Sequence, residues 1–190
     1  LAEGSDPNNG FSWPEGDCRW PDFSDEAAAA GVEGEGWALG EVMPNVTFID
    51  AHDGELDLHQ YWGCVVVLEL SAGWCNPCRA VAEEAEEFFQ EFKDRGFVLI
   101  HILMNGNVDG EPSDTAFLQE WTEDYGLTFP VVRLDDPPTY TDPLRTAGTM
   151  SGGIPNFIVL DRDLRIDFQN AGWPDTPVRD RVAELIDATP

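Results

Sequence analysis

Two cysteines separated by two residues, Cys75 and Cys78, constrain this chain more than any other feature of its sequence. They follow residues 65–70, a short apolar run rich in β-branched side chains, which predicts a buried strand. Residues 79–95 then repeat apolar side chains at three- and four-residue spacings with glutamates between them. This pattern predicts an amphipathic helix that stops at Gly96. The cysteine pair is therefore expected where a buried strand turns into a helix.

This position favours redox chemistry at the two thiols. Unpaired N–H groups and the dipole of a helix N-terminus stabilise a thiolate, so Cys75 is the expected nucleophile. Cys78 lies one turn further into the helix, where it would be more buried and within reach of Cys75. It would then be the resolving thiol, which closes the internal disulfide and releases a mixed-disulfide partner. Pro77 suits the first helical turn, where its missing N–H costs little.

Two structural roles for the pair stay open as alternatives. A zinc site would need two further ligands at matching spacing. Cys18 and Cys64 are isolated in the sequence, and the three histidines form no ligand pair. A purely structural disulfide is the other alternative at this spacing.

Beyond the cysteine motif, four further segments resemble the thioredoxin superfamily, and more closely its TlpA-like and redoxin (AhpC/TSA-type) thiol-disulfide oxidoreductases. They are residues 39–48 as the entry strand, 53–58 as the following hairpin, 62–68 as the central strand, and 152–161 as the segment that holds the family's cis-proline. The resemblance implies an α/β, thioredoxin-like fold with a central mixed β-sheet flanked by helices. It also implies a redoxin-type helical insertion, for which residues 113–125 have a helical apolar pattern.

The resemblance implies a substrate-binding face beside the cysteines. Ile154 and Pro155 should be joined by a cis peptide bond that faces the dithiol, leaving the Ile154 backbone free to pair with an extended substrate segment. The alternative is an ordinary proline at the start of a strand. Trp74, directly before the first cysteine, should contact the substrate, with ordinary aromatic packing as the alternative.

Glu69 is an acid inside an apolar strand, where an unpaired carboxylate is costly to bury. In thioredoxin a buried acid at the corresponding position moves the proton of the resolving thiol. By that resemblance Glu69 is a candidate general base for Cys78. The alternative is that Glu69 reaches solvent or pairs with a cation. His101 lies in a second apolar run and is expected to be a packed core residue rather than a ligand.

Residues 1–36 differ from the remainder of the chain. Gly, Pro, Asp, Asn and Ala dominate there, and no helical or strand period persists. Several aromatic residues nevertheless suggest that this N-terminal extension packs on the thioredoxin-like domain, residues 37–190. The chain has four cysteines, so the cysteine motif leaves Cys18 and Cys64. We expect them to form a structural disulfide that joins the extension to the domain, with two free thiols as the alternative.

The formal charge of −27, from 37 acidic and 10 basic residues, argues against nucleic acid or anionic membrane surfaces as partners. A structural disulfide implies an oxidising compartment. We therefore expect an extracytoplasmic location, in the periplasm or cell envelope. Because the sequence begins at Leu1 without a methionine, a signal peptide or lipoprotein anchor is expected to have preceded it.

The predicted function is thiol-disulfide exchange between the Cys75–Cys78 pair and protein thiols or disulfides, without a cofactor. The resemblance implies an extracytoplasmic reductant that a membrane-associated electron donor serves. A thiol peroxidase of the redoxin family is one alternative, but it needs threonine three positions before the nucleophile, where this chain has Ala72. A non-catalytic copper-binding module is the other, although such relatives have three residues between the cysteines.

Overall fold

The computed structural model describes residues 32–134, 144, 153–172 and 176–188. The elements in chain order are β1 (Thr47–Asp50), β2 (Glu55–Asp57), the 3-10 helix η1 (Leu58–Tyr61), β3 (Val65–Ala72), α2 (Asn76–Phe92), the 3-10 helix η2 (Lys93–Arg95), β4 (Phe97–Asn105), α3 (Thr115–Tyr125), β5 (Val131–Arg133), β6 (Asn156–Leu160), β7 (Ile166–Ala171) and α5 (Thr176–Asp187).

The strands of the described residues form one mixed sheet in the order β2-β1-β5-β4-β3-β6-β7. β3 is parallel to β4, and β4 is parallel to β5. β6 and β7 add antiparallel on one side, and β1 and β2 add antiparallel on the other. Every residue of β3 is buried, because the strand is central in the sheet and both of its faces are covered. This is the predicted thioredoxin-like fold.

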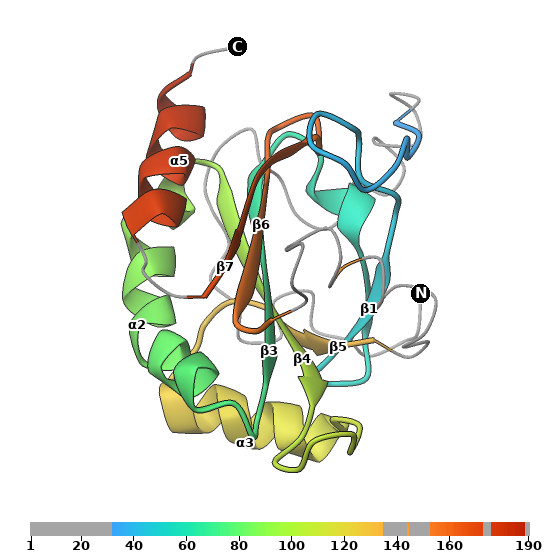
Figure 1. Ribbon diagram of the computed structural model, residues 1–190, viewed down its shortest axis with the longest axis vertical. Coiled ribbons are helices and arrows are strands. Elements are labelled where there is room, and N and C mark those ends of the chain that lie inside the picture. Colours follow the sequence, from blue (N-terminus) through green and yellow to red (C-terminus); the bar gives the residue numbers. More distant parts are fainter. Residues whose placement is uncertain (1–31, 135–143, 145–152, 173–175, 189–190) are drawn as a thin grey trace.

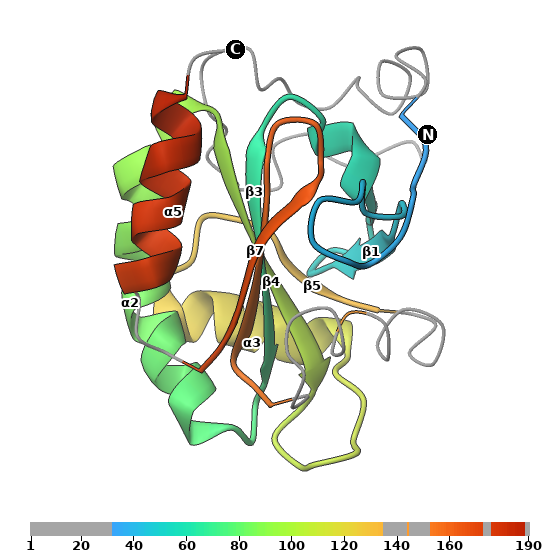
Figure 2. The same ribbon diagram turned by 45° about the horizontal axis from the view of Figure 1, so that its top comes forward.

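Two layers cover the faces of the sheet. α2, α3 and α5 lie on one face, and η1 lies on the other with the segment that leads into β1 (Figures 1 and 2). Alternation along β3 and β4 divides the core accordingly. Val65, Val67, Leu99 and Leu103 belong to the cluster beneath the helices. The other cluster takes the even-numbered residues Val66, Leu68, Leu70, Val98, Ile100 and Ile102.

Phenylalanine side chains form much of the core beneath α2. Phe88, Phe89 and Phe92 of this helix are buried, and each of their rings lies within 6.4 Å of the Phe97 ring at the start of β4. Gly96, between η2 and β4, has a left-handed backbone with φ 80°, as its predicted role as a helix stop requires. The amphipathic pattern of the sequence therefore fixes α2 against the centre of the sheet.

The segment that was expected to be the entry strand, residues 39–48, is mostly irregular, so its predicted extent is wrong. β1 begins only at Thr47, and Val42 makes an isolated bridge with Arg165. Pro44 lacks the N–H that a continuous ladder needs, which explains the late start. The neighbouring Met43 instead donates its backbone N–H to the Leu164 carbonyl oxygen at 3.0 Å.

The last residues of the predicted extension contact the domain. Val32 packs against the core cluster on the η1 side. Glu35 forms an ion pair with Arg165 at 2.8 Å. The remainder of the extension, residues 1–31, lies outside the described residues, so the domain boundary stays a prediction. Among the helices that are described, none combines the length and the apolar character needed to cross a bilayer.

Candidate active site

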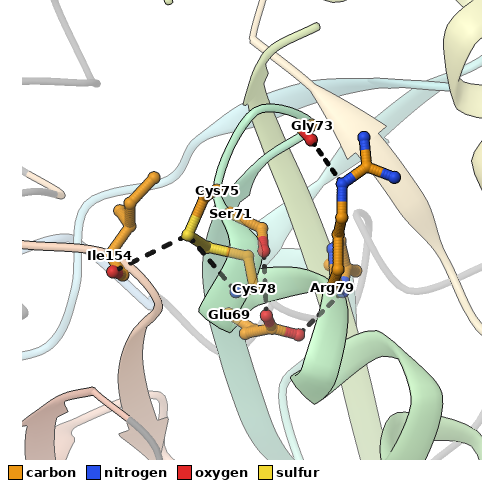
Figure 3. Close-up of a disulfide and its surroundings, with 8 residues drawn as sticks. Glu69, Ser71, Gly73, Cys75, Cys78, Arg79 and Ile154 are labelled. Atoms are coloured by element: carbon orange, nitrogen blue, oxygen red, sulfur yellow. Dashed lines mark hydrogen bonds and ion pairs between the residues drawn. A yellow bond between two sulfur atoms is a disulfide. The ribbon is translucent and has the colours of Figure 1, made fainter. Parts of the chain in front are cut away.

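The two cysteines of the motif form a disulfide at the N-terminus of α2 (Figure 3). Cys75 is the N-cap residue of this helix, and its Sγ accepts a hydrogen bond of 3.2 Å from the backbone N–H of Cys78. The helix begins at Asn76, earlier than the predicted Arg79, because the sulfur cap and Pro77 in the first turn both suit a helix start. The Cys78 N–H, which has no partner within the helix, favours a thiolate at Cys75 Sγ once the disulfide is reduced.

The two sulfurs have different surroundings. Cys78 is fully buried, whereas Cys75 lines a surface hollow of about 350 Å³. Apolar side chains from Trp74, Pro77, Met104 and Ile154 contribute to this hollow, together with the polar residues Asn76, Asn105 and Asp109. A substrate that enters the hollow therefore meets Cys75.

The predicted cis peptide bond between Ile154 and Pro155 is confirmed. The Ile154 carbonyl oxygen lies 3.8 Å from Cys75 Sγ, on the side of the disulfide that faces away from Cys78 (Figure 3). Trp74 is 40% exposed, which is unusual for so large an apolar side chain and makes pure core packing the wrong description of this residue. Trp74 and Ile154 thus both line the hollow beside Cys75, and their contact with a substrate stays a prediction.

Glu69 is fully buried in β3 and does not reach solvent. Its Oε1 accepts a hydrogen bond of 3.1 Å from the Ser71 hydroxyl, and its Oε2 lies 2.7 Å from Nδ1 of His101. Figure 3 shows Glu69 and Ser71 on the Cys78 side of the disulfide, opposite Ile154. A carboxylate and an imidazole are therefore enclosed together behind the buried sulfur.

His101 is the site residue whose partner the sequence-based reasoning missed. It is buried as predicted, but it contacts Glu69 and also packs against Trp121, with ring centroids 5.7 Å apart. A signal was present in the sequence, since each of the two parallel strands carries one ionisable residue at its fifth position. The observed register pairs Glu69 directly with His101.

Arg79 links three parts of the structure around the site. Its Nε donates to the Gly73 carbonyl oxygen at 2.8 Å, and its terminal nitrogen donates to Asn107 Oδ1 at 2.7 Å. Its guanidinium also lies 5.4 Å from the centre of the Trp121 ring. This side chain therefore ties the turn before the cysteines to the loop after β4 and to α3. The sequence pattern predicted that Arg79 belongs to this helix but indicated none of these contacts.

Cys64 lies at the other end of β3 from the motif, is 1% exposed and is disulfide-bonded. Its predicted partner, Cys18, lies outside the described residues, so the pairing itself stays a prediction. Cys64 belongs to the core cluster on the η1 side of the sheet. It is therefore separate from the site around Cys75. Within the described part of the chain, no group of three or more His, Cys, Asp or Glu residues is placed to hold a metal ion.

A family model and several known proteins resemble this chain. The sequence model of the AhpC/TSA family matches residues 39–169. The thiol-disulfide oxidoreductase ResA of Bacillus thuringiensis is 26% identical over 93 residues, which cover 49% of this chain and 50% of that protein. The chain thus spans about half the length of the ResA proteins it matches.

Solved structures share the fold at low sequence identity. The thioredoxin domain of a thiol-disulfide oxidoreductase from Bacteroides vulgatus superposes with a TM-score of 0.62 at 20% identity, covering 79% of this chain and 99% of that one. The exposed lipoprotein thioredoxin Etrx1 of Streptococcus pneumoniae superposes with a TM-score of 0.58 at 21% identity, covering 74% of this chain and 99% of that one. The fold is therefore thioredoxin-like over most of the chain.

Proposed function

Because the chain belongs to the AhpC/TSA family, we propose that it is a thiol-disulfide oxidoreductase that exchanges the Cys75–Cys78 pair with protein substrates. The observation that carries this proposal is the disulfide at the N-terminus of α2, in which Cys75 is 4% exposed and lines the hollow whereas Cys78 is fully buried and does not. The ResA relatives, which carry the same activity in their names, support it.

Cys75 performs the first step in the reducing direction. Its thiolate, stabilised by the Cys78 N–H and the helix N-terminus, attacks one sulfur of a substrate disulfide. A bond forms between Cys75 and that sulfur, and the other substrate sulfur leaves as a thiolate that takes up a proton. Trp74 and Ile154 bind the substrate chain, since both line the hollow beside Cys75.

Cys78 performs the second step. Its thiol gives up a proton, and the resulting thiolate attacks Cys75 Sγ, so that the internal disulfide forms and the second substrate thiolate is released. Two electrons have then moved from the protein to the substrate. We assign Glu69 as the base that accepts the Cys78 proton, because it is a buried carboxylate on the Cys78 side of the disulfide. His101 holds this carboxylate in place through the 2.7 Å contact.

The test is the equilibrium between the dithiol and the disulfide. Alkylation followed by peptide mass spectrometry across a dithiothreitol or glutathione series reports the oxidised fraction of Cys75 and Cys78. A reversible two-electron couple supports the proposal. A potential near the roughly −270 mV of thioredoxin marks a reductant, and one near about −120 mV marks an oxidant. The absence of any reversible couple would end the proposal.

We also propose that the protein acts outside the cytoplasm, as a reductant that receives electrons from a membrane-associated donor. Cys64 is disulfide-bonded, and disulfides outside redox motifs persist mainly in oxidising compartments. The likeness to a lipoprotein thioredoxin supports the same location. Non-reducing peptide mapping is expected to find Cys64 joined to Cys18. Recovery of Cys18 as a free thiol from the unreduced protein would refute that pairing.

A further inference from the structure

The hollow beside Cys75 combines apolar walls with one acidic side chain. Trp74, Met104 and Ile154 supply the apolar surface, and Asp109 contributes the carboxylate. Asp109 lies in the loop between β4 and α3 and is exposed, as is its neighbour Val108 at 61%. A hollow with apolar walls and a few placed polar groups has the usual form of a binding site, so the surface beside Cys75 offers a substrate both apolar contacts and one carboxylate.

The loop that carries Asp109 is fixed to the turn before the cysteines. The Gly73 N–H donates to the Asn105 carbonyl oxygen at 3.0 Å, and the Trp74 N–H donates to the Gly106 carbonyl oxygen at 3.1 Å. Within the loop, the Gly106 N–H donates to the Glu111 carbonyl oxygen at 2.9 Å. Asp109 therefore has a defined place relative to Cys75.

Steric fit and side-chain contacts fix the loop as well. A Cβ on Gly73 would lie 2.7 Å from the Gly106 carbonyl oxygen. The backbones of the turn and the loop are therefore too close together for a side chain at position 73. Arg79 adds its hydrogen bond to Asn107. The backbone of the loop that carries Asp109 is thus held against the turn before the cysteines by hydrogen bonds and by close contact.

The charge of Asp109 is not compensated within the described residues, where it makes no ion pair or hydrogen bond. No described residue that lines the hollow is a cation. Arg79, which is close in the fold, directs its guanidinium to Gly73, Asn107 and the Trp121 ring instead. A cationic group on a substrate could therefore pair with the Asp109 carboxylate.

We propose that Asp109 makes this site selective for polypeptide segments that carry a lysine or arginine next to the reactive cysteine. The inference rests on the proposed thiol-disulfide exchange and names its substrate class. The substrate cysteine contacts Cys75, apolar neighbours pack on Trp74, Met104 and Ile154, and the flanking cation pairs with Asp109. The overall charge of −27 attracts any cation at long range, whereas Asp109 acts on the residues beside the cysteine.

The test uses the full chain, reduced, and three disulfide-linked peptide homodimers that differ only in the residue after cysteine: Lys, Ala or Glu. Each reaction oxidises one protein dithiol and releases two peptide thiols, which a thiol reagent counts. Exposed ion pairs are modest in strength, so we expect the second-order rate constant for oxidation of the protein dithiol to be about 5- to 20-fold higher with the Lys peptide than with the Glu peptide. The ratio should shrink at high salt, because screening weakens both attraction and repulsion.

Asp109→Asn and Glu120→Gln each remove one negative charge, so comparing them separates the effect of the Asp109 carboxylate from the effect of the overall charge. Asp109→Asn should reduce the Lys-to-Glu ratio to about 2-fold, and Asp109→Lys should reverse it. Glu120→Gln removes one negative charge from an exposed residue of α3 outside the hollow and should leave the ratio unchanged. An unchanged ratio in Asp109→Asn, or an equal drop in both neutralised variants, overturns the proposal. Failure of all three peptides to react with Cys75 instead overturns the oxidoreductase function.

Discussion

The two sulfurs of the Cys75–Cys78 disulfide lie between unlike surroundings. On the Cys75 side, the exposed Trp74 and the Ile154 carbonyl line an open hollow. On the Cys78 side, Glu69 is fully enclosed together with Ser71, which donates a hydrogen bond to it, and with His101, which contacts its other oxygen. The two cysteines are three residues apart, yet one lines the hollow and the other lies on the side of the buried ionisable groups.

This difference separates two tasks that a dithiol has to perform. Nucleophilic attack needs access to a partner protein, which only the hollow provides. Release of the partner needs a proton to leave the second thiol, and a buried carboxylate can accept it without competing water. We therefore expect substitutions on the Cys75 side to impair attack on the substrate disulfide, and substitutions on the Cys78 side to impair release of the substrate.

Replacing the cysteines one at a time gives the largest expected effect. Cys75→Ser removes the nucleophile, so reduction of a disulfide peptide should stop entirely. Cys78→Ser keeps the nucleophile but removes the resolving thiol, so the protein should accumulate as a stable mixed disulfide with the peptide. Intact-mass spectrometry under non-reducing conditions measures both outcomes. A mixed disulfide that forms through residue 78 in Cys75→Ser would contradict the assignment of the two sulfurs.

Glu69→Gln should slow the second step while leaving the first nearly unchanged. General bases typically contribute about 10²- to 10⁴-fold, so we expect the mixed disulfide to persist at least about 100-fold longer. Acid quenching and mass spectrometry in a single turnover follow both steps in one experiment. Equal slowing of both steps would mean that the substitution disturbs the fold rather than proton transfer.

His101→Gln is the matched control for the buried pair. It removes the imidazole that contacts Glu69 but leaves the carboxylate, so it should slow the same second step by a smaller factor. Losing one partner of a buried pair costs about 3–5 kcal/mol, so urea unfolding should first establish that both variants are folded under assay conditions. Slowing confined to the first step in His101→Gln would remove His101 from the role of positioning residue.

Sequence patterns predicted the parts of the fold that depend on burial. The buried run of β3, the amphipathic period of α2 and the stop at Gly96 are all confirmed, since each follows from where apolar side chains must lie. The late start of β1 was not predicted, because the extent of a strand depends on which neighbours offer hydrogen bonds. Here Pro44 has no N–H to donate, and the regular strand begins only at Thr47.

The site was predictable to the extent that it is local in sequence. The Cys75–Cys78 disulfide and the cis bond at Pro155 were both anticipated. The family resemblance also implied that Ile154 faces the dithiol. Other contacts between distant segments were not anticipated, because they depend on strand register and loop placement. The pairing of Glu69 with His101 requires the alignment of β3 and β4, and Asp109 reaches the hollow only through the path of the loop after β4.

Gly73→Ala tests how closely the open side is packed against that loop. A Cβ at this position would lie 2.7 Å from the Gly106 carbonyl oxygen and would also collide with Phe117 Cζ, nearer than real Cβ contacts allow. Overpacking of this kind costs about 1–3 kcal/mol in unfolding free energy, measurable by urea denaturation. Gly106→Ala is the matched control, since its Cβ would meet nothing nearer than 3.8 Å. Equal destabilisation of both variants would show that these close contacts of the Gly73 Cβ are not the cause.

Arg79→Ala is expected to have the smallest effect, confined to the open side. It removes hydrogen bonds to Gly73 and Asn107, each worth about 1 kcal/mol, without touching Glu69. The Trp74 amide, which donates to the loop, should then exchange with deuterium about 5-fold faster. Arg95→Ala, which breaks an exposed ion pair with Asp187, should leave that amide unchanged. If Arg79→Ala instead slows only the Cys78 step, the two sides of the disulfide are not independent, and the loop that carries Asp109 is coupled to the buried pair through Trp121.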